Sequence, residues 1–162
     1  MDLYKFEYKR MKPQEQLPLH RQDTWELTYI VFGRGKRVLG DSETDYAEGN
    51  LVFIPPHIPH CWKFDEDYVD DDQCIAHLTL SFKTEFIDRC LTAFPELTER
   101  LEALKSVSSV LSFDDATTSD IAEMLNRMAS ESESELLPYV FRLLLLLSKR
   151  ESEATVVGRF SD

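Results

Sequence analysis

The chain has 162 residues and a formal net charge of −12, because 30 acidic residues outnumber 18 lysines and arginines. A hydrophobic content of 43% and a charged content of 30% are those of a folded globular protein and exclude a disordered chain. A body this acidic repels phosphate, so the chain by itself is not expected to bind DNA, RNA or an anionic membrane. The length predicts one domain, or one core with an appendage.

The cysteines and the apolar runs indicate the cellular compartment in which the protein is expected. Cys61, Cys74 and Cys90 are odd in number and widely spaced, which favours reduced intracellular thiols over disulfides or a zinc site. The first residues lack the apolar core of a signal peptide. The longest apolar run, Leu143–Leu147, is far too short to span a bilayer. We therefore expect a soluble cytoplasmic protein.

Residues 1–82 contain short apolar runs separated by turn-forming residues. The runs predict strands at Trp25–Phe32, Lys36–Gly40, Asn50–Ile54 and Gln73–Phe82. Within the last of these, His77–Phe82 alternates apolar and polar residues, as a half-buried strand does. Strands at this spacing predict a small antiparallel sandwich or barrel over residues 1–82.

From residue 83 the apolar period becomes helical, which predicts a helical subdomain over residues 83–150 that packs on the barrel. A serine-rich break is expected at Ser106–Ser112. Thr117–Asp120 has the pattern of a capping box and predicts the start of the next helix. Residues 151–162 are expected to form a frayed tail or linker.

The last predicted helix is apolar on nearly all sides, so one partner helix cannot cover it. One interpretation buries this helix under the β-domain. The other assigns part of it to a homodimer seam, formed helix against helix. The residues of that predicted dimer interface are Val140, Phe141, Leu144 and Leu147.

The segment from His20 to Trp62 carries the chemistry. Six residues separate Glu26 from Gly33, and five separate Gly49 from Pro55, with His60 following. These spacings resemble the two signature motifs of the cupin superfamily. The resemblance implies an antiparallel β-barrel of the double-stranded β-helix or jelly-roll type.

The chain departs from the cupin motifs at three positions. Gln22 stands where a second histidine is expected, His57 where a glycine is expected, and Phe64 where an asparagine is expected. Metal-binding cupins use the histidines and the glutamate as ligands. Gln22 is a weak donor to transition metals, so no metal is favoured; a metal, if present, would use His20, Glu26 and His60.

The competing interpretation is a hydrogen-bonding pocket for an uncharged polar ligand. The predicted ligand-binding residues are His20, Gln22, Glu26 and His60, with Trp62 as a stacking face. A third interpretation is that the histidines are simply hydrogen-bonded structural residues.

A closer resemblance covers almost the whole chain. Leu19–Ile30, Tyr46–Pro56 and Pro59–Trp62, followed by Phe94–Leu97 and Leu111–Phe113, resemble the sensor domain of AraC-type bacterial transcription regulators. The resemblance implies that the barrel binds a sugar or other small metabolite and that the helices form a homodimer. It also implies a DNA-binding helix-turn-helix part, which we expect beyond Asp162.

Three functional hypotheses follow. The leading one is a non-enzymatic effector-binding and dimerisation domain that needs no cofactor. The alternative is a small metal-dependent cupin enzyme, a dioxygenase or a sugar isomerase. The third is a stand-alone sugar-binding cupin. An acidic segment, Asp65–Asp72, lacks the glycine and distal glutamate of an EF-hand and is expected to be a solvated, mobile loop.

Overall fold

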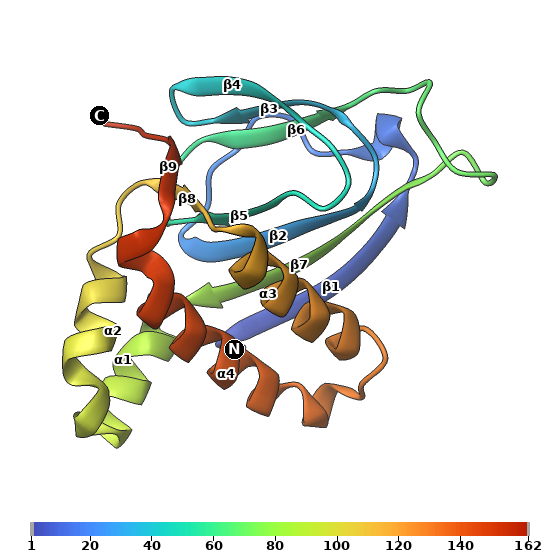
Figure 1. Ribbon diagram of the computed structural model, residues 1–162. Coiled ribbons are helices and arrows are strands. Elements are labelled where there is room, and N and C mark those ends of the chain that lie inside the picture. The colour runs from blue at the N-terminus through green and yellow to red at the C-terminus, as the bar shows by residue number, and fades with distance from the viewer. Residues whose placement is uncertain (1, 162) are drawn as a thin grey trace.

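The computed structural model describes residues 2–161 and shows two antiparallel sheets that face each other, with helices on one side (Figure 1). The larger sheet has the strand order β1-β7-β2-β5-β8-β9, and the smaller has the order β4-β3-β6. This arrangement confirms the predicted antiparallel barrel followed by helices. The strands are β1 (Tyr4–Met11), β2 (Thr24–Phe32), β3 (Gly35–Leu39), β4 (Ser42–Tyr46), β5 (Leu51–Ile54), β6 (His60–Phe64), β7 (Ile75–Lys83), β8 (Val110–Ser112) and β9 (Thr155–Gly158).

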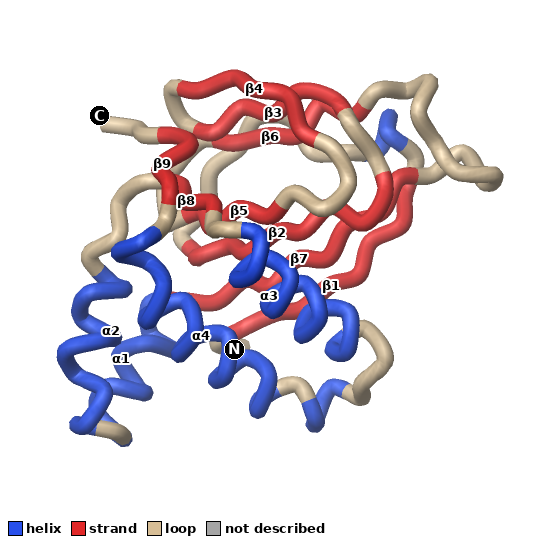
Figure 2. The backbone as a smooth tube through the Cα atoms, in the orientation of Figure 1, coloured by secondary structure: helices blue, strands red, loops and turns tan. Residues whose placement is uncertain are grey.

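The helices gather on the face of the larger sheet that points away from the smaller one (Figure 2). They are α1 (Thr84–Ala93), α2 (Thr98–Lys105), α3 (Asp115–Met128) and α4 (Leu137–Arg150). Among the described residues, no helix is both long enough and apolar enough to cross a membrane.

The two faces of the larger sheet differ in chemistry, because successive side chains of a strand point to opposite faces. On the outer face, Leu27 of β2 lies opposite Leu80 of β7, and both are completely buried under the helices. On the inner face, Thr28 lies opposite Thr79, and Glu26 lies opposite Ser81. The sheet therefore presents an apolar surface to the helices and a polar surface to the inside of the barrel.

Several segments differ from the sequence-based prediction, and β4 and β6 lie outside the predicted strands. β1 was not predicted, although its apolar residues alternate with Lys5, Glu7 and Lys9. β8 lies within the predicted break at 106–112, where its hydrogen bonds to β5 and β9 come from distant parts of the chain. The cap of α3 is Asp114, which accepts a hydrogen bond from the Thr117 amide, so the predicted start at Thr117–Asp120 is wrong.

The predicted homodimer seam is wrong for three of its four residues. Val140, Leu144 and Leu147 are 1%, 2% and 0% exposed, because they pack inside the chain against the core beneath the larger sheet. Phe141 is half-buried and packs on Phe94, with ring centroids 5.5 Å apart. The alternative interpretation, a helix buried under the β-domain, describes this face of α4.

Residues 155–160, here called the C-terminal clasp, are ordered against the barrel and correct the prediction of a frayed tail. β9 pairs with β8, and beyond it the backbone of Arg159 exchanges two hydrogen bonds with Asp41, at 2.7 and 2.9 Å. Asp41 lies in the turn between β3 and β4, so the clasp joins the two sheets. The approach is close: a Cβ at Gly40 would overlap the carbonyl oxygen of Arg159, and one at Gly158 would overlap that of Leu39.

We expect Gly40→Ala to lower the free energy of unfolding by about 2–4 kcal/mol, because the methyl group adds a steric overlap to left-handed backbone strain. The matched control is Gly49→Ala: Gly49 also has a positive φ, but nothing lies within 4 Å of its added Cβ. The control should lose only about 1 kcal/mol from strain. Equal losses in urea unfolding of the two variants would contradict the close contact of the clasp.

Candidate functional site

A cavity of about 280 Å³ lies inside the barrel, between the edge strands β1 and β6. The inner face of the larger sheet forms one wall, and β6 with residues 16–22 forms the other. The five predicted ligand-binding residues all line this cavity: His20, Gln22, Glu26, His60 and Trp62. The structure thus brings them together, while their role in binding a ligand stays a prediction.

Glu26 and His60 form the buried centre of the site. Glu26 is 8% exposed and His60 is 2% exposed, and they come from facing sheets. His60 Nε2 lies 3.5 Å from Glu26 Oε2. Within the described part of the chain, Nε2 has no hydrogen-bond partner. A buried polar atom left in this state costs free energy, and a bound polar group can recover it.

Neighbouring side chains hold the Glu26 carboxylate in place. Gln22 Nε2 donates to Oε1 at 2.7 Å, and Thr28 Oγ1 donates to Oε2 at 3.0 Å. Thr28 Oγ1 also lies 3.2 Å from Thr79 Oγ1. Gln22, which replaces a cupin histidine, therefore orients the glutamate.

Backbone contacts orient the two histidines. His60 Nδ1 lies 2.8 Å from the carbonyl oxygen of Ile58, and His20 Nδ1 lies 2.8 Å from that of Pro18. A carbonyl oxygen only accepts hydrogen bonds, so Nδ1 is the donor in both contacts. The backbones of His20 and His60 also exchange two hydrogen bonds, which fixes residues 16–20 along the free edge of β6.

The Glu26–His60 contact shifts both pKa values. Burial alone would raise the pKa of Glu26, but the His60 imidazole and the hydrogen bonds from Thr28 and Gln22 bring it below its ordinary value of 4.5. Burial alone would lower the pKa of His60, but the Glu26 carboxylate and the Ile58 carbonyl raise it above 6.5. Both shifts therefore favour the charged forms, imidazolium and carboxylate, over the neutral ones.

The sequence reasoning missed the part of the cavity wall that β1 and β7 supply. Lys5, Glu7 and Lys9 line the cavity from β1, and His77 and Thr79 from β7. The alternation of charged residues in β1 is the signal that could have found this wall. Burial together with Lys9 lowers the pKa of His77 below its ordinary value.

Trp62 lies at the edge of the cavity in an aromatic cluster. Its ring packs edge-on against Tyr46, with centroids 5.1 Å apart, and the guanidinium of Arg37 lies 6.0 Å from its centroid. These contacts fix the orientation of the indole. A rigid aromatic wall of this kind can stack on the apolar face of a small ligand.

The donor set does not fit a metal ion. His60, with Nδ1 on a carbonyl and Nε2 unpartnered, has the orientation of a metal ligand. However, Gln22 and Thr28 each donate a hydrogen bond to one oxygen of Glu26 and so compete with a metal for that carboxylate. In the described residues, no three histidine, cysteine or acidic side chains are grouped so that they could hold a metal. The side chains at the centre of the cavity are instead linked by hydrogen bonds.

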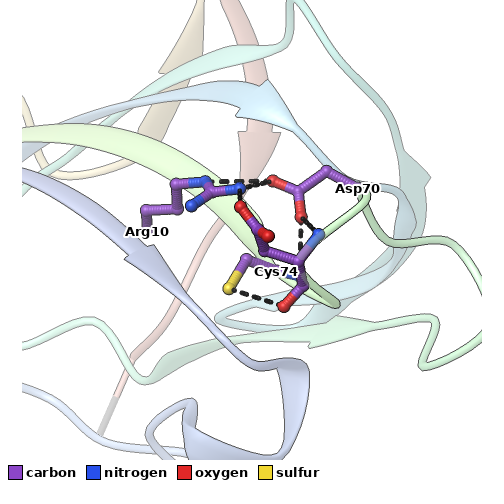
Figure 3. Close-up of polar contacts among 4 residues, drawn as sticks. Arg10, Asp70 and Cys74 are labelled. Atoms are coloured by element: carbon purple, nitrogen blue, oxygen red, sulfur yellow. Dashed lines mark hydrogen bonds and ion pairs between the residues drawn. The ribbon is translucent and has the colours of Figure 1, made fainter.

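The acidic loop between β6 and β7 is held by an ion pair outside this cavity (Figure 3). Arg10 donates to Asp70 at 2.7 and 3.0 Å and to Asp72 at 2.7 Å. The other oxygen of Asp70 accepts the amides of Asp72 and Cys74. Arg10 thus ties Asp70 and Asp72 to the end of β1, while the Asp72 side chain stays 70% exposed, in agreement with the expectation of a solvated loop.

Comparison with known proteins identifies the fold. Residues 8–68 match the cupin domain family, and the fold is a cupin fold. The AraC-like transcriptional activator CuxR is similar in structure over 79% of this chain and 42% of its own, with a TM-score of 0.50 and 15% identity.

A cupin 2 conserved barrel domain protein from Rhodopseudomonas palustris has 25% identity and a TM-score of 0.39. That similarity covers 49% of this chain and 52% of the other, so the match spans about half of that relative. An oxalate decarboxylase from Bacillus subtilis matches 49% of this chain and 21% of its own, with 21% identity and a TM-score of 0.41. No curated protein is significantly similar in sequence.

We expect the stability that the Glu26–His60 pair contributes to depend on pH. The contribution of His60, whose pKa is raised, is present below about 6.5 and is lost as pH rises through the folded pKa. The contribution of Glu26, whose pKa is lowered, is present above about 4.5 and is lost as pH falls through the folded pKa. The pair is therefore worth most between these values.

The measurement is the difference in unfolding free energy between the native chain and Glu26→Gln, from pH 4 to pH 9. We expect a loss of about 2–4 kcal/mol near pH 5.5 and a smaller loss at pH 9. Glu43→Gln, which changes an exposed carboxylate 3.9 Å from Lys63, is the control and should cost little at any pH. A loss for Glu26→Gln that is independent of pH would contradict the pairing.

Proposed function

We propose that this chain is the effector-binding domain of an AraC-type bacterial transcription regulator, and that a sugar or other small polar metabolite binds in the barrel cavity. The observation that carries the proposal is the polar inner face of the larger sheet, with the unpartnered Nε2 of His60 at its centre. Stability alone favours filling such a space with apolar side chains. A cavity that keeps a buried glutamate and histidine is built for a polar ligand.

The size of the cavity supports a small ligand. Drug-sized ligands occupy pockets of about 300–1,000 Å³. The cavity measures about 280 Å³, so it suits a molecule of the size of a monosaccharide. Glu26 offers an acceptor for hydroxyl groups, the Nε2 edge of His60 faces the same space, and Trp62 offers a stacking face.

The helices support the role of a regulator. The fold likeness to the AraC-like activator covers 79% of the chain, more than the barrel strands alone supply. The proposal assigns DNA contact to another part of the regulator, because this chain carries a net charge of −12. An effector alters DNA binding only if it prefers one arrangement of the protein over another.

The proposal gives the chain no catalytic activity of its own. A metal-dependent enzyme is the competing function, and the metal-like orientation of His60 is the observation in its favour. Elemental analysis of the purified chain separates the two. Stoichiometric metal that disappears in His60→Ala would favour the enzyme, and sub-stoichiometric metal would favour the sensor.

We also propose that the regulator is a homodimer and that the dimer uses the open groove on α3 and α4. With Val140, Leu144 and Leu147 buried, the apolar side chains that line this groove include Phe141, Leu145 and Leu146. The groove measures about 990 Å³ and is bordered by several arginines. The proposal therefore assigns the face of α4 that carries Phe141, Leu145 and Leu146 to a second copy.

Sedimentation velocity at micromolar concentrations should show a dimer that Leu145→Glu converts to monomer, because a carboxylate placed in an apolar contact is costly to desolvate. The control Leu19→Glu changes an exposed leucine far from the helices and should leave the dimer intact. A native chain that sediments only as a monomer would contradict the homodimer.

A thermal-shift screen of pentoses, hexoses and other small polar metabolites should yield a binder. At about 100 times its dissociation constant the ligand adds about 2.7 kcal/mol, which raises Tm by roughly 5–10 °C. Trp62→Ala should weaken binding at least about tenfold through loss of the stacking face. The control His57→Asn alters an exposed residue outside the cavity and should bind normally. Unchanged affinity in Trp62→Ala would place the ligand elsewhere.

A further inference from the structure

Two kinds of polar group line opposite sides of the cavity. The inward side chains of β1 form what we call the lysine rim, which consists of Lys5, Glu7 and Lys9. On the far side, β2 and β6 supply the acceptor floor, which consists of Glu26 and His60. The rim lies at the sheet edge and is partly exposed, whereas the floor is buried.

Strand register sets the separation between rim and floor. Lys5 lies opposite Ser81 of β7, and Ser81 lies opposite Glu26 of β2, so these three residues form a row across three strands. Adjacent strands are about 4.8 Å apart, which puts the ends of the row about 10 Å apart at their Cα atoms. In the next row, Glu7 lies opposite Thr79, and Thr79 lies opposite Thr28. Hydroxyl-bearing side chains thus fill the space between rim and floor.

The two lysines of the lysine rim carry more positive charge than the single carboxylate of Glu7 neutralises. Glu7 contacts Lys5 at 3.3 Å and Lys9 at 3.4 Å, one lysine at each carboxylate oxygen. Both distances exceed the 2.7–2.9 Å that is usual for charge-assisted hydrogen bonds. Two ammonium groups, each with three donors, therefore share one carboxylate. The rim carries a net positive charge in a chain whose net charge is −12.

The acceptor floor favours hydroxyl groups over a carboxylate. Glu26 accepts from Gln22 and Thr28 and repels a second carboxylate, and Nε2 of His60 lies 3.5 Å from Glu26 with no hydrogen-bond partner among the described residues. Hydroxyl groups satisfy both residues, because a hydroxyl donates to the carboxylate and accepts from the imidazolium. A ligand in this cavity is therefore directed with its hydroxyls at the floor and its negative charge at the rim.

We propose that the effector is a hydroxylated monocarboxylate of about six carbons, a uronic or aldonic acid, whose carboxylate binds between Lys5 and Lys9 and whose hydroxyls bind Glu26 and His60. This inference rests on the proposed function and names the chemical class of its ligand. A neutral sugar leaves the two lysines unused, and an amine is repelled by them.

The test is isothermal titration calorimetry with matched pairs of ligands at low salt. The pairs are glucose and glucuronate, galactose and galacturonate, and mannose and mannuronate, with gluconate as the open-chain acid and hexanoate as a carboxylate without hydroxyls. We expect at least one sugar acid to bind about tenfold more tightly than its neutral partner. The preference should shrink at 0.5 M NaCl, because salt screens an exposed charge pair.

Charge-neutralised variants assign the preference to the lysine rim. Lys5→Gln combined with Lys9→Gln should abolish the advantage of the acid over its neutral partner. Lys36→Gln combined with Lys63→Gln makes the same change in net charge on exposed residues of the smaller sheet, outside the cavity, and should keep the preference. Lys5→Arg combined with Lys9→Arg should also keep it.

The outcomes separate the inference from the proposed function. Neutral sugars that bind as tightly as their acids, or a preference that survives loss of both rim lysines, overturn the inference and leave the sensor proposal standing. Hexanoate that binds as tightly as the best sugar acid overturns the role of the acceptor floor. Failure of every sugar and sugar acid to bind at millimolar concentration overturns sugar sensing, and the inference falls with it.

Discussion

The alternation of side chains along β2 and β7 is the constraint on which the rest of the structure depends. It sends Leu27 and Leu80 to the helices and Glu26 and Thr79 to the inside of the barrel, so one sheet serves as both the wall of the core and the floor of the cavity. A register shift of one residue would exchange the two faces. The helices are thus needed for stability, because they cover the apolar face.

Much of the barrel and the centre of the site could be predicted from the sequence. The spacing of Glu26, Gly33, Gly49 and His60 pointed to a cupin barrel, and the five predicted ligand-binding side chains line one cavity. Strand β1 and the C-terminal clasp were missed, because a strand at a sheet edge is decided by its distant partner. The homodimer seam was misplaced because an apolar helix face looks the same whether it packs on its own sheet or on a second chain.

The paired strands β3 and β6 connect the cavity to the C-terminal clasp. Leu39 pairs with His60 across β3 and β6, and the next residue, Gly40, packs against the carbonyl of Arg159 in the clasp. The amide of Gly40 also donates to the carbonyl of Pro59. His60 is therefore one strand pair away from the C-terminal clasp.

The most direct test of the account is the protonation of His60, followed by nitrogen-15 NMR of the imidazoles in the native chain and in Glu26→Gln. The account predicts a proton fixed on Nδ1, a pKa above 6.5 in the native chain and a lower pKa in the variant. It also predicts that the bound effector shifts the His60 signals and leaves those of exposed His57 unchanged. A His60 pKa that is the same in both proteins, together with His60 signals that do not shift when ligand is added, would contradict a binding site built on Glu26 and His60.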